Sequence, residues 1–290
     1  MSKHTPVLLQ EAIEALTIKP TGKYIDCTLG AGGHTLAIAS KLSSGQVLSL
    51  DRDPQACRSF SHPKVTVINR PFSQVDQVSS VSTVHGLLMD LGTSYEQLAT
   101  AERGFSFRKA GPLDMRMDNQ ATLLTAHQVL RTYTAAQLSF IFKEYSDERH
   151  HLRIARIIKQ HLPSLHTTTD LAELIEREIG WHEKHQHPAT RVFQALRMTV
   201  NEELKELTLG MEKAFELLQS GGRLVIITFH SLEDRMVKLF MMTQVKQKKF
   251  AHFEIKGRAR WIHKSLQPSL QELKQNVRSR SSRLRCIEKL

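Results

Sequence analysis

A glycine-rich turn between two apolar runs is the feature that most constrains how this chain can fold. Residues 24–29 read as a buried strand, the turn Gly30-Ala31-Gly32-Gly33-His34 follows, and a helical stretch leads to a second apolar run that ends on Asp51. Glycines let a backbone approach a bulky ligand, and the helix after them presents unpaired N–H groups. Asp51 lies eighteen residues after Gly33, close to the ~20 expected of an acid that binds ribose hydroxyls. The unit therefore predicts a nucleoside site and leaves two cofactors open, NAD and S-adenosylmethionine.

Strand signals continue beyond this unit, stop, and then resume. Apolar, β-rich runs lie at residues 65–68, 84–89, 223–229, 250–255 and 284–288. Short runs of this kind separated by helical stretches predict a doubly wound parallel α/β sheet, in which ligands sit at the carboxyl ends of the strands. Asp51 and Asp90 both stand at such ends.

The stretch between the early and late strands shows only helical periodicity, from about residue 122 to residue 180. A further long helix is predicted from Thr190 towards Leu218, with Gly221-Gly222 closing it as a C-cap pair. The simplest organisation is a sheet domain made of residues 1–105 and 206–290. An inserted all-helical domain at residues 106–205, expected to recognise the substrate, interrupts it.

Positive charge is concentrated at the C-terminal end of the chain. The whole chain carries 40 Lys and Arg against 29 Asp and Glu, a net charge of +11, and residues 246–290 alone hold thirteen Lys and Arg against three Glu. Concentrated positive charge is typical of a phosphate-binding surface, although charge alone leaves a solvated tail as the alternative. Aromatic and apolar residues interleaved with the cations argue against a disordered tail, so nucleic acid is the predicted partner.

Other bulk properties indicate a reduced intracellular protein. Three cysteines without paired spacing indicate neither a disulfide framework nor a zinc site. No apolar run approaches the ~20 residues needed to cross a bilayer, and the first residues lack the apolar core of a secretory signal. We expect a cytoplasmic protein without a metal and without membrane contact; its oligomeric state is open.

The details of the glycine turn favour S-adenosylmethionine over NAD. The turn does not supply the Gly-x-Gly-x-x-Gly fingerprint of a dinucleotide site. S-adenosylmethionine has no pyrophosphate and does not need that fingerprint, and Asp26 inside the first strand fits such a site. Asp90 is placed to hold the amine of the methionine moiety or to accept a proton from a substrate, with a turn-forming role as the alternative.

Several segments carry side chains suited to RNA. Phe and Arg residues at positions 103–107 and 111–118, including Arg116, predict a binding loop, unless the rings only anchor the insertion to its core. Arg191 and Arg197 on the helix after His187 are candidate phosphate contacts. In the basic C-terminal region the candidate RNA-binding residues are Arg278, Arg280 and Arg283.

The corner after the apolar run at residues 223–229 is a second candidate substrate contact. His230 follows that run directly and is predicted to lie at the active edge of the sheet. Ser231 and Asp234 are predicted to form a capping box for the next helix, which explains them without catalysis. Asp90 and His230 are thus the candidate catalytic residues.

These motifs together resemble the bacterial ribosomal small-subunit RNA methyltransferase H family. The matching blocks span nearly the whole chain in order and are His4-Thr5-Pro6-Val7-Leu8-Leu9, residues 24–34, Asp51-Arg52-Asp53-Pro54-Gln55-Ala56, residues 102–107, 111–118, 187–191 with Phe193-Gln194-Ala195, and 221–235, and Arg280-Ser281-Ser282-Arg283-Leu284-Arg285. The family methylates the exocyclic N4 amine of a cytidine in 16S ribosomal RNA. The resemblance implies a Rossmann-like, S-adenosylmethionine-dependent methyltransferase sheet with an inserted all-helical domain, and a 30S subunit, assembled or assembling, as partner.

The resemblance also implies the cofactor-binding residues, which are Gly32, Gly33, His34, Asp51, Phe72, Asp90 and Gln97. Phe72 follows the third predicted strand, where its ring would pack on adenine. One departure concerns the pocket: where the family stretch Asp-Leu-Gly is expected to continue Val-Ser-Ser, this chain has Thr93-Ser94-Tyr95.

Other functions stay open from the sequence. A methyltransferase acting on another RNA or DNA base would use similar chemistry, although Asp90-Leu91-Gly92 is not the Asn/Asp-Pro-Pro-Tyr/Phe motif typical of DNA amino-methyltransferases. An NAD-dependent oxidoreductase would explain Asp51 but neither the imperfect glycine pattern nor the basic end. A non-catalytic RNA-binding module would fit the charge and leave the cofactor turn unused.

Overall fold

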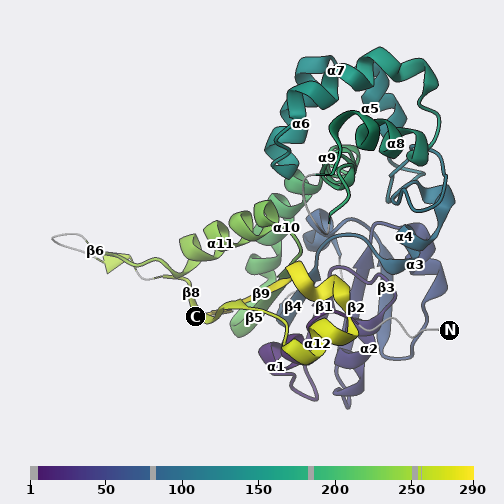
Figure 1. Ribbon diagram of the computed structural model, residues 1–290. Coiled ribbons are helices and arrows are strands. Elements are labelled where there is room, and N and C mark those ends of the chain that lie inside the picture. Colours follow the sequence, from purple (N-terminus) through teal and green to yellow (C-terminus); the bar gives the residue numbers. More distant parts are fainter. Residues whose placement is uncertain (1–5, 79–82, 182–185, 250–253, 256) are drawn as a thin grey trace. The chain divides into compact units, whose positions relative to one another are not determined.

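The computed structural model describes residues 6–78, 83–181, 186–249, 254–255 and 257–290, which form two compact units (Figure 1). Unit 1 contains residues 1–92 and 205–290, and unit 2 contains residues 93–204. Residues 93–105, which the sequence assigned to the sheet domain, belong to unit 2. Phe105, for example, is buried in the core of the helical unit.

Unit 1 is built on a seven-stranded sheet with the order β3-β2-β1-β4-β5-β9-β8. Its strands are β1 (Lys23–Asp26), β2 (Gln46–Asp51), β3 (Val65–Asn69), β4 (Val84–Asp90), β5 (Leu218–Thr228), β8 (Ala259–Leu266) and β9 (Arg283–Lys289). Strands β1 to β5 are parallel, and β9 runs antiparallel to both of its neighbours. The predicted α/β class with a Rossmann-like parallel sheet is confirmed.

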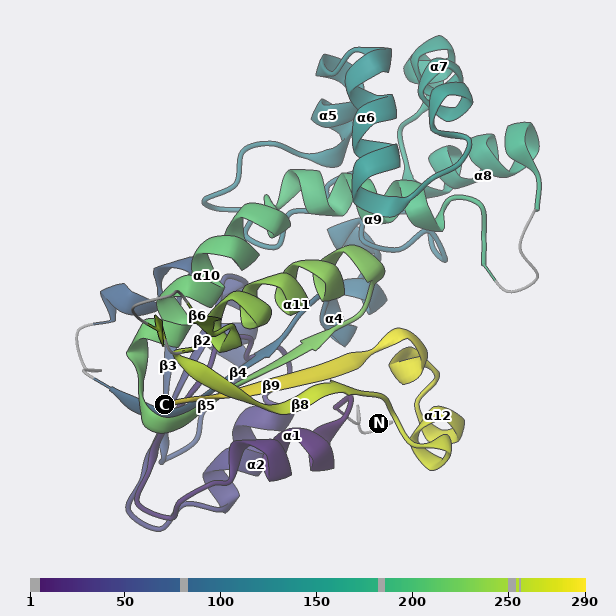
Figure 2. The same cartoon turned by 90° about the vertical axis from the view of Figure 1, so that its left-hand side faces the viewer.

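Helices cover both faces of this sheet, as Figure 2 shows. Helices α1 (Leu9–Leu16) and α2 (Gly33–Ser40) pack on one face with Tyr24 and Val225, and α10 (Glu203–Leu217) and α11 (Ser231–Val245) pack on the other with Ile25 and Ile226. Neighbouring strand residues thus enter opposite apolar layers, because successive side chains of a strand point to opposite faces. The remaining elements of the unit are α3 (Pro54–Ser59), η1 (Phe72–Gln77), α12 (Leu270–Gln275) and η4 (Val277–Ser281).

The C-terminal strands differ from the prediction. Of the predicted strand at 250–255, residues 250–253 lie outside the described residues, and Glu254–Ile255 forms the short β7, which pairs with β6 (Lys248–Lys249) outside the main sheet. The seventh strand of the sheet is β8, which the sequence pattern did not predict. Its sequence mixes Arg, His and Lys with apolar residues, as an edge strand with an exposed side can.

The predicted long helix from Thr190 is in fact two helices, α9 (Thr190–Val200) and α10. Glu202 between them has φ of 49°, in the left-handed region, which ends regular helical bonding. Gly221 and Gly222 lie inside β5 and do not cap the helix, because α10 already ends at Leu217.

Unit 2 consists of helices around one apolar core. They are α4 (Tyr95–Ala99), η2 (Ala101–Arg103), α5 (Ala126–Thr132), α6 (Ala135–Ser146), α7 (His151–His161), η3 (Leu162–Ser164), α8 (Thr168–Ile179) and α9. Reciprocal capping boxes begin α4, α5, α6 and α8, so local sequence sets where these helices start. None of the helices in the described ranges is long and apolar enough to cross a membrane.

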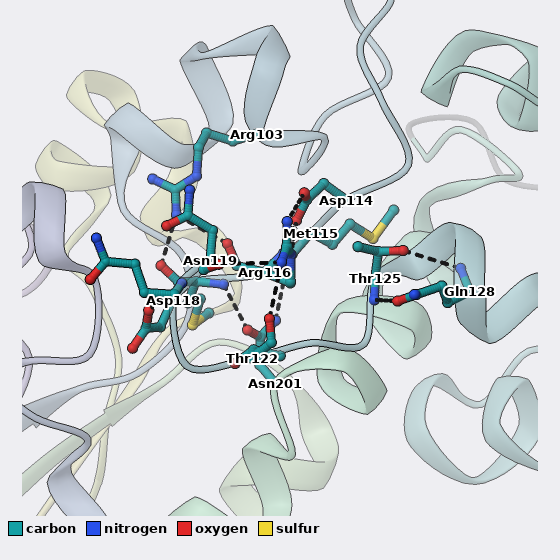
Figure 3. Close-up of polar contacts among 12 residues, drawn as sticks. Arg103, Asp114, Met115, Arg116, Asp118, Asn119, Thr122, Thr125, Gln128 and Asn201 are labelled. Atoms are coloured by element: carbon teal, nitrogen blue, oxygen red, sulfur yellow. Dashed lines mark hydrogen bonds and ion pairs between the residues drawn. The ribbon is translucent and has the colours of Figure 1, made fainter.

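The irregular segment before α5 is held by one buried side chain, Asn201 (Figure 3). Its Oδ1 accepts the N–H of Met117, and its Nδ2 donates to the carbonyls of Met115 and Arg197, each at 2.8 Å. Met115 itself has φ of 62° and is fully buried. Asn201 therefore joins the end of α9 to a loop more than eighty residues earlier.

We expect Asn201→Ala to destabilise unit 2 by about 3 kcal/mol, because buried backbone groups would lose their partners. Denaturant unfolding followed by far-UV circular dichroism measures this change. Asn119→Ala is the matched control, since the Asn119 side chain is exposed. Equal stability of the two variants would contradict the role given to Asn201.

Candidate active site

The carboxyl ends of four neighbouring strands bring acids together at one edge of the sheet in unit 1. Asp26 ends β1, Asp51 ends β2, Asp90 ends β4, and Glu233 lies in the first turn of α11 after β5. Burial is the main cause that raises the pKa of Asp26 and of Asp90, and neighbouring acids raise both further: Asp51 acts on Asp26, and Asp26 and Glu233 act on Asp90. Ligands of open α/β sheets bind at this edge.

The glycine turn is packed against protein side chains. Gly30 and Gly32 have φ of 49° and 79°, a region that favours glycine. A Cβ at Gly32 would lie 2.1 Å from the ring of Phe60, and a Cβ at Gly33 would lie 2.2 Å from Cγ of Pro6. Packing within the protein therefore requires glycine at both predicted cofactor residues.

Asp26 is fully buried beneath this turn. Its Oδ1 accepts the N–H of Thr28 at 3.0 Å, and its Oδ2 accepts the hydroxyl of Thr35 at 2.6 Å. Thr35 also contacts the hydroxyl of Ser49 at 2.8 Å, which links the network to β2. Burial raises the pKa of Asp26 to about 6, although these hydrogen bonds act in the opposite direction. Asp26 thus fixes the turn from below and has no solvent-facing role.

Asp51 connects the glycine turn to the end of β2. Its Oδ2 accepts the N–H of Gly30 and its Oδ1 accepts the N–H of Asp53, both at 2.8 Å. Burial raises the pKa of Asp51 to about 6. Each carboxylate oxygen has a second lone pair, so ribose hydroxyls can still donate to this group, as the sequence predicts.

His34 stands between the N-terminal segment and Asp90. Its Nε2 lies 3.1 Å from the carbonyl oxygen of Val7, and its Nδ1 lies 3.5 Å from Oδ2 of Asp90. A carbonyl only accepts, so Nε2 carries a proton, and a proton on either Nδ1 or Asp90 makes the second contact favourable. The backbone N–H of Asp90 donates to the Thr28 hydroxyl at 2.7 Å, so both Asp90 and the turn are anchored to the same residue.

His230 is engaged by the start of α11. Its Nδ1 accepts the N–H of Glu233 at 3.4 Å, and its Nε2 lies 3.0 Å from Oε1 of that residue. Glu233 is buried, and its Oε2 accepts the N–H of Phe229 at 3.1 Å. The cap therefore belongs to His230, and the predicted capping box of Ser231 and Asp234 is wrong. Contact of His230 with the substrate amine stays a prediction, since both its ring nitrogens are placed against Glu233.

Asp234 lies one position beyond the third residue of the helix, where a capping box would need it, and pairs instead with Arg285. The buried guanidinium binds both carboxylate oxygens, at 2.7 and 2.8 Å, and so joins α11 to β9. A bidentate pair of this kind is stronger than a hydrogen bond to a neutral N–H.

A strap made of residues 6–8 covers the glycine turn from outside. Pro6 lies against Gly33 and Val7 accepts from His34. Leu8, fully buried and with φ of 51°, donates its N–H to Oε1 of Glu272 at 2.8 Å. Helix α12 at the other end of the chain therefore holds the strap, and through it His34, in place.

The two other predicted cofactor residues lie in different units. Phe72 follows β3, and its half-buried ring packs over Gly210 of α10, where a Cβ would approach the ring to 2.3 Å. Gln97 is in unit 2 and exchanges capping hydrogen bonds with Ser94 at the start of α4. Of the cofactor residues, unit 1 thus brings together Gly32, Gly33, His34, Asp51 and Asp90, with Phe72 at the end of β3.

Two of the predicted RNA-binding arginines are bound to carboxylates within unit 2. Arg116 pairs with both oxygens of Asp114 at 2.7 and 2.8 Å and also donates to loop carbonyls (Figure 3). Burial disfavours the ionised form of Asp114, but the hydrogen bonds and charge of Arg116 outweigh it and lower the pKa of Asp114. Arg197 pairs with both oxygens of Glu203 at 2.8 Å. The geometry of both favours a structural role.

Of the other four candidates, Arg278 and Arg280 are more accessible. Arg191 is half-buried in the first turn of α9. Arg278 and Arg280 are exposed on η4, and Arg283 of β9 donates to the hydroxyl of Ser265 at 3.2 Å. The expected binding loop at 103–118 is largely anchored in the core, since Phe105, Met115 and Met117 are buried.

The acidic edge fits a cationic cofactor. Asp90 Oδ1 is buried, and no residue in the described part of the chain bonds to it. Burial, together with Asp26 and Glu233, raises the pKa of Asp90 well above its usual value. The sulfonium and ammonium groups of S-adenosylmethionine would relieve this unfavourable concentration of acid, whereas the pyrophosphate of a dinucleotide would be repelled. Among the described residues, no three His, Cys, Asp or Glu side chains gather as metal ligands would.

Several residues of the site were missed from the sequence. Thr28, Thr35 and Ser49 form the network around Asp26, Glu233 supports the His230 corner, and Glu272 anchors the strap. Only Thr28 and Thr35 carried a signal, because they flank the glycine turn directly.

We expect Glu272→Ala to weaken S-adenosylmethionine binding by up to about tenfold, because the buried N–H of Leu8 loses its acceptor and the strap loosens over His34. Glu272→Gln keeps an acceptor oxygen and is the matched control. Isothermal titration calorimetry of each variant measures the effect. A Glu272→Ala protein that binds as tightly as the Gln variant would show that the strap does not support the site.

Comparison with known proteins identifies the family. The MraW methylase family matches residues 1–290. Proteins named ribosomal RNA small subunit methyltransferase H from Hydrogenovibrio crunogenus and Francisella philomiragia are each 42% identical, with at least 99% of this chain and 97% of theirs covered. The protein of the same name from Baumannia cicadellinicola is 41% identical, with 99% of this chain and 98% of that protein covered.

Solved structures are more distant. An rRNA methylase from Streptococcus thermophilus is 12% identical, with a TM-score of 0.43 and coverage of 100% of this chain and 99% of that one. These values are too low to bear on the site. The full-length family match confirms the family and the cofactor predicted from the sequence, S-adenosylmethionine. This chain belongs to the MraW methylase family.

Proposed function

We propose that this chain transfers a methyl group from S-adenosylmethionine to the N4 amine of a cytidine in 16S ribosomal RNA. Its relatives carry the name ribosomal RNA small subunit methyltransferase H, which supports the RNA substrate. The observation that carries the chemistry is the buried, unbonded Oδ1 of Asp90 at the acidic edge. The N4 position itself rests on the family resemblance of the sequence motifs.

Asp90 has the properties that methylation of this amine requires. The lone pair of a cytosine amine is delocalised into the ring, so an acceptor must bind the N–H and take up the proton as the amine reacts. When bound, the cofactor supplies an electrophilic methyl group and positive charge. That charge favours the ionised form of Asp90, whose pKa is raised in the free protein. An ionised Asp90 then accepts a hydrogen bond from the amine through Oδ1.

The neighbours of Asp90 hold it in place for this role. His34 and Thr28 fix its Oδ2 and its backbone N–H. Glu233 holds the backbone of Phe229 at the adjoining strand end. These contacts keep the carboxyl group at the edge where an unstacked cytidine would have to enter.

The charge of unit 1 supports RNA as the substrate. Unit 1 holds 26 Lys and Arg against 15 Asp and Glu, a net of +11, whereas unit 2 holds 14 against 14, a net of 0. Attraction to phosphates therefore resides in unit 1, where Arg278 and Arg280 are exposed. Unit 2 is proposed to contribute recognition of RNA shape or bases, and the 30S subunit in the cytoplasm is the proposed setting of the reaction.

Incubation of the purified protein with 30S subunits and labelled S-adenosylmethionine, followed by mass spectrometry of the RNA nucleosides, tests the proposal. We expect N4-methylcytidine, and we expect Asp90→Asn to lower the rate at least 100-fold, the scale of a lost proton acceptor. Asp76→Asn is the matched control, because Asp76 instead pairs with Lys213 at 3.0 Å.

Other products would redirect the assignment. Labelled methyl groups on another base would indicate a methyltransferase of different specificity. Tight cofactor binding without transfer to any nucleic acid would indicate a non-catalytic module, and preference for NADH would indicate an oxidoreductase.

Affinity for S-adenosylmethionine should fall as the pH drops through about 6. The pKa of Asp51 is raised to about 6, so below that pH the group is neutral and accepts ribose hydroxyl hydrogen bonds less well. If only the ionised form binds, affinity at pH 5 is roughly tenfold lower than at pH 7. Calorimetric titrations across this range measure the loss. Asp51→Asn should bind weakly and lack this component of the pH dependence, and a wild-type affinity that is constant between pH 7 and pH 5 would refute the ribose role.

A further inference from the structure

Four aromatic rings of unit 2 form a row that runs from its core to its surface. Phe193 is buried, and the ring of Phe107 meets it at a centroid distance of 4.8 Å. His187 lies 4.6 Å from Phe107, and Trp181 lies 5.2 Å from His187. The outermost ring, that of Trp181, is 56% exposed. This aromatic row thus ends in a large indole surface open to solvent.

Glu176 of α8 contacts both outer rings of the row. Its Oε1 accepts the indole N–H of Trp181 at 2.6 Å, and its Oε2 lies 3.3 Å from Nε2 of His187. Nδ1 of His187 accepts the N–H of Ala189 at 3.1 Å, so Nε2 carries the proton and donates to Glu176. Exposed side chains that are already held in one orientation lose little entropy when a partner binds.

Exposed cations lie beside the inner part of the row. Residues 103–113 and 186–201, which carry three of the four rings, contain five Arg and Lys and no Asp or Glu. Arg197 among them is paired with Glu203, and α8, which leads into Trp181, is acidic, with one Asp and three Glu against one Arg. Two of these cations, Arg108 and Lys109, are exposed directly after Phe107. Glu176 is the acid at the row, and each of its carboxylate oxygens already faces an N–H donor.

We propose that Trp181 is a stacking surface for an unpaired base of an RNA substrate, with Arg108 and Lys109 placed to contact the adjoining phosphates. The identity of the partner as RNA rests on the proposed function. A rigid, exposed ring beside cations is the arrangement by which proteins bind single-stranded nucleic acid, because every base has a face that can stack. The aromatic row also gives a role to the His187 segment, which the methyl-transfer chemistry does not use.

The fluorescence of Trp181 reports the contact directly. The chain has two tryptophans, Trp181 and Trp261, so the Trp261→Phe variant leaves Trp181 as the only emitter. We expect a ten-nucleotide single-stranded oligoribonucleotide to quench its emission. A duplex of the same sequence should quench it much less, because its bases are already stacked.

Substitutions separate stacking from general attraction. Trp181→Ala should weaken binding of the single strand roughly 5- to 150-fold, the range of one lost base–aromatic stack, and Trp181→Phe should retain most of the affinity. Phe140→Ala is the matched control, since Phe140 is an equally exposed aromatic residue of the same unit (59%) that lies on α6 outside the row. Circular dichroism checks that each variant is folded.

Two outcomes would overturn the inference. One is unchanged Trp181 emission on addition of the single strand, and the other is a Trp181→Ala protein that binds RNA as well as Phe140→Ala does. Failure of the proposed function is distinguishable, because quenching with no methylated cytidine would leave the stacking surface standing. Methylation that is unaffected in Trp181→Ala, together with unchanged binding, would reject only the stacking surface.

Discussion

The buried carboxyl group of Asp26 is the interaction on which the site depends. A carboxyl group in an apolar interior is costly unless it is hydrogen-bonded, and Asp26 accepts hydrogen bonds from Thr28 and Thr35. These contacts fix the end of β1 and the first turn of α2 on either side of the glycine turn. Burial raises the pKa of Asp90, and the charge of Asp26 raises it further. The fold therefore fixes the glycine turn but also gathers carboxyl groups at one edge of the sheet. A cationic ligand bound there would offset their mutual repulsion.

The parallel strands could be predicted from the sequence because they are buried on both faces and read as continuous apolar runs. The edge strand β8 could not, since Arg260 and Lys264 alternate with its apolar residues. The break between α9 and α10 was also invisible. At this break Asn201 bonds to a backbone segment more than eighty residues away, and helical periodicity carries no record of such a contact.

The same distinction applies to the site. Asp51 and Asp90 were predictable because strand ends in a parallel sheet converge by topology. The contacts around the site could not be predicted in this way. Asp90 contacts His34, and the strap contacts Glu272, only because the fold brings these distant residues together. The arginines show a different limit: Arg116 has its acid partner two residues away, and Arg197 has its partner six residues away. Spacing alone could not have shown this, because Arg278 also has an acid six residues away, Glu272, and is exposed.

The division of charge between the units suggests how RNA recognition is divided. Phosphate attraction from a unit of net charge +11 is long-ranged, weakens with salt and does not distinguish sequences. A unit with no net charge adds little to this long-range attraction. Such a unit can instead contribute a contact that depends on an unpaired base. An exposed ring that is held by hydrogen bonds provides this contact without adding charge to the unit. Selectivity for an unstacked nucleotide would then come from unit 2, and phosphate attraction from unit 1.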